Sequence, residues 1–275
     1  NQDPDDGCSD VCEYEERQIY LTSSNGSTGF YEYDIVSDTW STKPNPPTST
    51  RSQIANDGTH VYLMGTDNVV YSYDPQSEQW TNEMAGPGNT VSSPIGFFQW
   101  FSDGFYYLQD GTSTMYVYRD NAWGNLDLGG NGSCAGTYDM ANDELYIRTY
   151  QRMGFRVLNT TDDTVARIIT DATNVGENSR TGSYYDGNFY AREFNGTVQR
   201  LDAQDGSKED TMAQPVSGHT GTDTDFATGY IYLSGYSGNA TVFQRFDPAD
   251  NSLTTLADSP NVSNHSSITV LRPVN

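Results

Sequence analysis

The chain has 275 residues, of which 14 are Lys or Arg and 37 are Asp or Glu, so its formal net charge is −23. This balance leaves no basic stripe to neutralise phosphates, which excludes nucleic acid as an obvious partner and argues against anionic membrane surfaces. No apolar run approaches the roughly 20 residues that a membrane-spanning helix needs. Lysine-poor, acidic surfaces suit a salty or calcium-containing medium, and a merely soluble acidic protein is the alternative reading.

Residues 1–14 are predicted to be an N-terminal tail. The chain begins with Asn1 and shows no signal peptide, so we expect a mature, secreted protein, extracellular or at the cell surface. The run Asp3–Gly7 is acidic, but it lacks the spacing of an EF-hand calcium loop. We therefore expect a solvated segment and no cofactor, with calcium as the alternative.

From residue 15 to residue 275 one pattern recurs six times. An apolar strand carries a central tyrosine in each copy, at Tyr20, Tyr62, Tyr107, Tyr146, Tyr190 and Tyr232. The steps between these tyrosines are 42, 45, 39, 44 and 42 residues. A period of roughly 40–50 residues with several short strands in each unit is typical of a β-propeller. The sequence therefore predicts an all-β, six-bladed β-propeller of four-stranded antiparallel blades.

Each blade is predicted to contain four kinds of strand. A small, polar inner strand such as Arg51–Ala55 comes first, and the tyrosine strand follows, apolar on both faces because neighbouring blades cover it. The third strand alternates, as in Phe30–Asp34 and Val70–Asp74, and ends in an acidic turn whose Asp residues are expected to bond their own backbone rather than a metal. A short outer strand completes the blade and carries Trp40, Trp80 or Trp123 in the first three copies.

The two ends of the chain are predicted to share one blade. Blade one begins with its second strand, at Glu15–Leu21, and lacks an inner strand of its own. The C-terminal stretch His265–Leu271 has the character of an inner strand. We expect it to complete blade one, since this removes the exposed edges that would invite aggregation.

The phrase Tyr-x-Tyr-Asp followed by Trp resembles the repeats of kelch-type propellers. It occurs as Tyr31-Glu32-Tyr33-Asp34 before Trp40 and as Tyr71-Ser72-Tyr73-Asp74 before Trp80. The Gly-Gly pair that usually follows the second strand in that family is absent, so the resemblance concerns the strand pattern. Kelch-like propellers include adhesion and assembly modules as well as enzyme domains, and the resemblance therefore implies a fold without choosing a function.

A basic rim is the candidate ligand site. The predicted inner strands begin at one mouth of the central channel, and the residues there include Arg51, Arg180, His219 and His265. Such a rim could hold an anionic sugar by charge-assisted hydrogen bonds, as a lectin would, or act as a polysaccharide lyase. The alternative is a set of polar residues that cap strand ends and hold water. No catalytic motif and no metal-binding signature is recognisable, so we favour a non-enzymatic protein.

The three cysteines are Cys8, Cys12 and Cys134. Cys134 is predicted on the inner strand of blade four, across the ring from the tail, and a disulfide needs Cα atoms within about 7 Å. We therefore expect Cys8 to pair with Cys12. The alternative is that one of them bonds a neighbouring subunit, since an odd number of cysteines in a secreted protein permits this.

Seven Asn-x-Ser/Thr sites permit N-glycosylation. They are Asn25, Asn131, Asn159, Asn195, Asn239, Asn261 and Asn264. All except Asn159 are predicted on the face of the disc that carries the basic rim, where glycans would hinder large substrates. The sequence thus favours a secreted structural or interaction propeller that self-assembles through its tail into an oligomer or filament. A protein that binds or cleaves an extracellular polysaccharide is the alternative.

Overall fold

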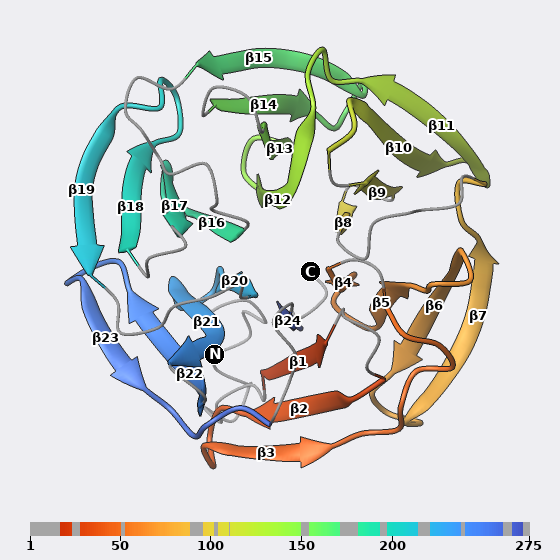
Figure 1. The fold of residues 1–275 in the computed structure, drawn as a ribbon, viewed down its shortest axis with the longest axis vertical. Helices are drawn as coiled ribbons and strands as arrows, with labels where there is room; N and C mark the ends of the chain where they lie inside the picture. Colours follow the sequence, from red (N-terminus) through yellow and green to blue (C-terminus); the bar gives the residue numbers. More distant parts are fainter. Residues whose placement is uncertain are drawn as a thin grey trace, which may run out of the picture.

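The chain folds into a closed ring of six antiparallel sheets, as a computed structural model shows (Figure 1). The structure describes residues 17–23, 28–50, 53–88, 96–101, 104–109, 111–149, 154–170, 181–192, 197–213, 221–237, 240–260 and 266–271. Within this part of the chain every regular element is a strand, and each sheet has four strands. The predicted all-β, six-bladed propeller is confirmed.

The blades follow one another in chain order around the ring, and each runs from an inner strand at the channel to an outer strand at the rim (Figure 1). From inside outward, blade one consists of β24 (Ser266–Val270), β1 (Gln18–Ser23), β2 (Phe30–Asp34) and β3 (Thr39–Thr42). Blade two consists of β4 (Ala55–Asn56), β5 (Val61–Met64), β6 (Val69–Asp74) and β7 (Gln79–Ala85). Blade three consists of β8 (Gly96–Phe101), β9 (Gly104–Gln109), β10 (Thr114–Arg119) and β11 (Ala122–Asp127). Blade four consists of β12 (Gly132–Asp139), β13 (Glu144–Thr149), β14 (Gly154–Asn159) and β15 (Thr164–Thr170). Blade five consists of β16 (Thr181–Tyr185), β17 (Asn188–Arg192), β18 (Thr197–Asp202) and β19 (Lys208–Ala213). Blade six consists of β20 (Thr222–Asp225), β21 (Tyr230–Ser237), β22 (Ala240–Asp247) and β23 (Ser252–Thr255).

The two ends of the chain do share blade one. Strand β24 pairs with β1 in an antiparallel ladder in which Ile19 lies opposite Val270 and Leu21 opposite Ile268. The ladder continues to the backbone N–H of Leu271, which donates to the carbonyl of Gln18 at 2.8 Å. The predicted closure is therefore confirmed, with the inner strand beginning at Ser266 and its partner at Gln18.

One inner strand differs from its predicted bounds. The sequence predicts a strand at Arg51–Ala55, whereas β4 covers Ala55–Asn56. The backbone N–H of Gln53 donates to the carbonyl of Gly96 in the next blade at 2.9 Å, so it does not extend the ladder with β5. The Asn56 side chain makes a similar sideways contact, donating to the carbonyl of Val270 in blade one at 3.0 Å. Contacts between blades thus replace contacts within the blade at this point.

The hydrophobic core lies between adjacent blades, as the doubly apolar tyrosine strands predict. Tyr20, Tyr107, Tyr146, Tyr190 and Tyr232 are buried, and Tyr62 is half-buried. Around Tyr20, for example, the Phe30 ring stacks at 5.3 Å and the Tyr73 ring of the next blade packs edge-on at 5.8 Å. These ring contacts bind neighbouring sheets face to face.

The tryptophans of the outer strands join successive blades. Each indole Nε1 donates to a backbone carbonyl at or just after the end of the outer strand of the preceding blade: Trp40 to Ala257 at 3.1 Å, Trp80 to Pro44 at 2.8 Å and Trp123 to Ala85 at 2.8 Å. At the next junction Arg156 takes this place, since its Nε donates to the carbonyl of Leu128 at 2.8 Å. The repeated Trp therefore contributes a link between blades as well as apolar area.

The acidic turns behave as turn caps. The Oδ1 atom of Asp34 accepts from the backbone N–H of Val36 at 2.8 Å, and that of Asp74 accepts from Gln76 at 2.9 Å. Hydrogen bonds to the ionised form lower the pKa of both carboxyls: the backbone N–H of Ser37 has the largest effect on Asp34, and the Ser77 hydroxyl has the largest effect on Asp74. Within the described residues no group of three or more His, Cys, Asp or Glu is arranged to hold a metal ion. The interpretation of these aspartates as turn residues is confirmed for Asp34 and Asp74.

Candidate functional site

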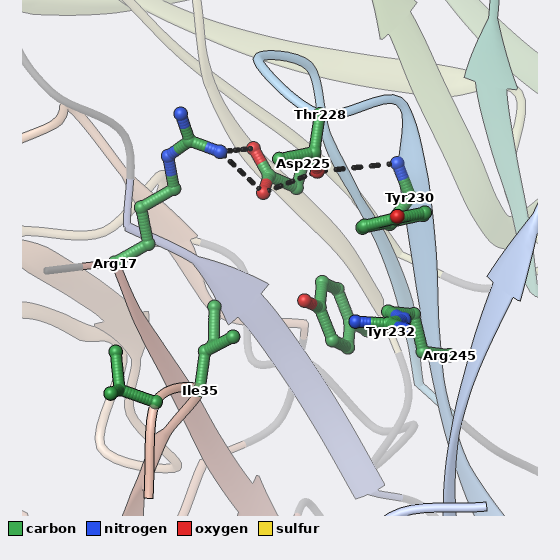
Figure 2. A pocket seen from close by; sticks show the side chains of 8 residues that line it. Arg17, Ile35, Asp225, Thr228, Tyr230, Tyr232 and Arg245 are labelled. Carbon is green, nitrogen blue, oxygen red and sulfur yellow. Dashed lines mark hydrogen bonds and ion pairs between the residues drawn. The ribbon is translucent and has the colours of Figure 1, made fainter. Parts of the chain in front are cut away.

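Described residues form a candidate site at the seam between blades six and one. Arg17 directly precedes β1, and Asp225 is the last residue of β20. The Nη1 atom of Arg17 donates to both carboxylate oxygens of Asp225, at 2.8 Å and 3.1 Å (Figure 2). The two side chains are only 6% and 5% exposed. Ring closure therefore buries an ion pair between residues that are 208 positions apart.

The turn after β20 shapes the acid of this pair. Thr228 donates its hydroxyl to Asp225 Oδ2 at 2.7 Å, and the backbone N–H of Ala227 donates to Oδ1 at 3.2 Å. Both carboxylate oxygens are thus hydrogen-bonded, which a buried charge requires. On the arginine the Nε atom is buried and has no hydrogen-bond partner among the described residues.

A second arginine forms the opposite wall. The guanidinium of Arg245, on β22, lies over the ring of Tyr230 at 4.3 Å from its centroid, which is a cation–π contact. Tyr232 is buried beside it. Burial and the nearby Asp225 carboxylate raise the pKa of the Tyr232 hydroxyl to about 12, although Arg245 and Arg17 oppose the shift. The phenol is therefore a neutral hydrogen-bonding group rather than a base.

The β2–β3 turn supplies an apolar rim. Ile35 and Val36 line the same cavity as the two arginines, and Val36 is 73% exposed. The cavity has a volume of about 60 Å³. Figure 2 shows the aliphatic side chains on one side of it and the Arg245–Tyr230 pair on the other. The lining also includes the Asp225 carboxylate and the Thr228 hydroxyl, so the cavity combines charged, hydroxyl, phenolic and aliphatic groups that can contact a ligand.

The predicted basic rim falls on parts of the chain that the structure does not describe. Arg51, Arg180, His219 and His265 all lie outside the described residues. The same holds for the tail 1–14 with Cys8 and Cys12, and for the sequons at Asn25, Asn195, Asn239, Asn261 and Asn264. The ligand-binding, disulfide and tail predictions therefore stay predictions.

Two sequons can be placed. Asn131 is exposed just before β12. Asn159 ends β14, and its side-chain oxygen accepts from the backbone N–H of Thr161 at 2.8 Å, so this carboxamide already caps a turn. Asn131 is thus the more accessible acceptor of the two.

Sequence reasoning missed the seam pocket. Its residues come from β20 to β22, from the β2–β3 turn and from the start of β1, and only closure brings them together. The available signal was the scarcity of basic residues, of which the chain has 14. An arginine near an acidic residue at the predicted closure was therefore a candidate for a functional site.

Among the described residues there is no helix that could cross a membrane.

Comparison with known proteins places the chain by its fold. No family model and no curated protein matches the sequence. Solved structures do match: a chain from a nidogen/laminin complex has a TM-score of 0.69 at 11% identity and covers 94% of this chain and 100% of its own length. The WD40 β-propeller domain of Doa1 has a TM-score of 0.56 at 13% identity, covering 90% of this chain and 81% of that one.

A chain of the mitotic checkpoint complex has a TM-score of 0.58 at 13% identity and covers 90% of this chain and 76% of that one. Identities this low establish the architecture and nothing finer. The chain is therefore a six-bladed β-propeller, and the seam pocket lies where its ring closes.

Proposed function

We propose that this chain is a secreted, non-enzymatic interaction propeller that self-assembles into an extracellular oligomer or filament. The observation that carries the proposal is the seam pocket, an arginine-lined cavity with an exposed apolar residue, Val36, at its rim. A pocket of binding chemistry beside an exposed aliphatic side chain suits contact with another protein.

The other described ionic groups support a structural role. Arg119 pairs with Asp163 at 3.5 Å, joining blades three and four. The Arg167–Glu144 pair lies within blade four, and Arg167 also donates to the carbonyl of Ala203 in blade five at 3.4 Å. These cations are thus occupied in holding blades together. Two of the similar structures are complexes, nidogen with laminin and the mitotic checkpoint complex, and an interaction role for this architecture is consistent with them.

The kelch-like repeat pattern is compatible with this proposal, because kelch-like propellers include adhesion and assembly modules as well as enzyme domains. A carbohydrate-binding or lyase function would use the predicted basic rim, and no described residue favours it over assembly.

The proposal is tested by the mass of the native protein in solution. The molar mass of the protein purified from its natural source should increase with protein concentration. Light scattering coupled to size-exclusion chromatography measures this molar mass. Glycopeptide mapping of the same material checks exposure to an N-glycosylation pathway. A protein that stays monomeric at every concentration would refute self-assembly, and its recovery only from the cell interior would refute secretion.

A further inference from the structure

The seam pocket contains more positive charge than ring closure needs. The Arg17–Asp225 pair is internally neutral, whereas Arg245 contacts the Tyr230 ring and the Tyr232 hydroxyl and has no ion-pair partner among the described residues. Within the described part of the chain no carboxylate lies within 4 Å of Arg245. Arg17 also keeps its buried Nε without a hydrogen-bond acceptor there. In a chain of net charge −23, such a pocket is suited to an anion.

The size of the cavity limits what this anion can be. One enclosed water needs about 10–15 Å³ of such space, and the cavity offers about 60 Å³. This is room for roughly four water-sized groups, which corresponds to a carboxylate on a stem of one or two carbons. An Asp or Glu side chain fits this volume. Planar guanidinium groups are also well matched to carboxylates.

The rim adds a second requirement. Val36 is 73% exposed where the β2–β3 turn meets the pocket. A ligand that also covers this side chain gains apolar burial at about 25 cal/mol per Å². The pocket therefore fits an acidic residue with an apolar neighbour in a polypeptide.

The chain itself contains such a segment. Residues 1–16 include seven acidic and no basic residues, and they place Val11 after Asp10 and Tyr14 between Glu13 and Glu15. This segment directly precedes Arg17, which lines the pocket. It therefore joins the described structure at the pocket wall. Two copies that face each other across this seam could exchange these segments reciprocally, as a two-fold dimer requires.

We infer that the seam pocket binds an acidic side chain from residues 1–16 of a second copy of this chain. The inference rests on the proposed self-assembly and names its receptor. Arg245 holds the incoming carboxylate, and Val36 packs against the apolar residue beside it.

The test compares the full chain with Arg245→Gln and, as matched control, Arg200→Gln. Arg200 pairs with Glu209 at 2.9 Å in blade five, away from the seam. Sedimentation velocity at low and high salt gives the dissociation constant of the assembly. Arg245→Gln should weaken assembly about tenfold or more at low salt, whereas Arg200→Gln should leave it unchanged. Arg245→Lys keeps the positive charge but loses the planar guanidinium that can donate two parallel hydrogen bonds to a carboxylate. Its dissociation constant should therefore lie between those of the wild type and Arg245→Gln. Thermal melts verify that each variant is folded.

A labelled peptide of residues 1–16, with Cys8→Ser and Cys12→Ser, provides an independent readout. It should bind the wild-type full chain, compete with assembly and fail to bind Arg245→Gln. Assembly that is insensitive to Arg245→Gln and to the peptide would overturn the inference while leaving self-assembly intact. A wild type that is monomeric at all concentrations would overturn both. Peptide binding to a chain that never changes mass would show that the segment docks on its own propeller, which also contradicts the inference.

Discussion

Trp40 and Ala257 are 217 positions apart in the sequence, yet the indole nitrogen of Trp40 donates to the carbonyl of Ala257 at 3.1 Å. The contact joins the outer strand of blade one to the end of blade six. Asp38 reinforces it, because its Oδ1 atom accepts from the backbone N–H of Ala257 at 2.7 Å. The outer rim of the propeller is therefore closed by side chains, while the inner rim is closed by the β1–β24 ladder.

Replacing Trp40 by Phe should lower the free energy of unfolding by about 1 kcal/mol for the lost hydrogen bond, plus a contribution from the smaller ring. Urea denaturation of the full chain measures the loss. The control is Trp100→Phe, because Trp100 has ring contacts but no inter-blade indole hydrogen bond among the described contacts. Equal losses for the two variants would contradict a specific role for the Trp40 link.

Breaking the buried ion pair at the seam should cost more. Asp225→Asn leaves the Arg17 guanidinium buried without its counter-charge, and removing one partner of a buried pair typically costs about 3–5 kcal/mol. The partly exposed pair of Arg200 and Glu209 serves for comparison, since its side chains are 28% and 38% exposed. Glu209→Gln should cost less than about 1 kcal/mol. Chemical denaturation gives the loss in the free energy of unfolding for each variant. Similar losses for the two variants would show that the Arg17–Asp225 pair does not stabilise the fold more than the Arg200–Glu209 pair.

The closure should also depend on pH through Asp223. This carboxyl accepts from the backbone N–H of Val270 at 2.8 Å and from the Thr269 hydroxyl at 3.2 Å, which ties β20 to β24. Burial and the neighbouring Asp225 raise its pKa from 3.8 to about 7, against the opposing effect of these hydrogen bonds. The folded state thus binds the proton more tightly than the unfolded state.

The stability that this proton contributes is fully present below pH 4 and is lost as the pH rises through about 7. The loss should have a slope of at most about 1.4 kcal/mol per pH unit. Asp223→Asn keeps a neutral group at this position and should remove that slope. Unfolding free energies of wild type and variant at several pH values between 4 and 8 give the difference, and parallel curves would rule out Asp223 as the titrating group.

Deleting residues 265–275 should prevent formation of the native ring. The truncation removes β24 and leaves β1 with one unpaired edge, which can pair with another molecule. We expect aggregation or unfolding, visible in light scattering and circular dichroism. A soluble, folded truncation product would contradict closure through β24.

The sequence predicted the repeating part of the fold better than its exceptions. Tyrosines such as Tyr20 and Tyr146 recur because every blade must bury its second strand on both faces. The spacing of these tyrosines therefore gives the number of residues in each blade directly. The short β4 was not predictable, because Gln53 bonds Gly96 of another blade, and a pattern within one repeat contains no information on that contact. The seam pocket was missed for a related reason: Arg17 and Asp225 lie in different repeats, and only the closed ring makes them neighbours.

The direction of the closing ladder has a mechanical consequence. Since β1 and β24 are antiparallel, Gln18 and Leu271 lie at the same end of their shared ladder. Tension applied between these two residues would load the hydrogen bonds between β1 and β24 one after another, so the two strands would separate stepwise from this end. A force transmitted from the body of one propeller to the body of the next would instead be spread over all six sheets. An assembly built to bear load should therefore transmit force through the blades rather than between the two chain ends.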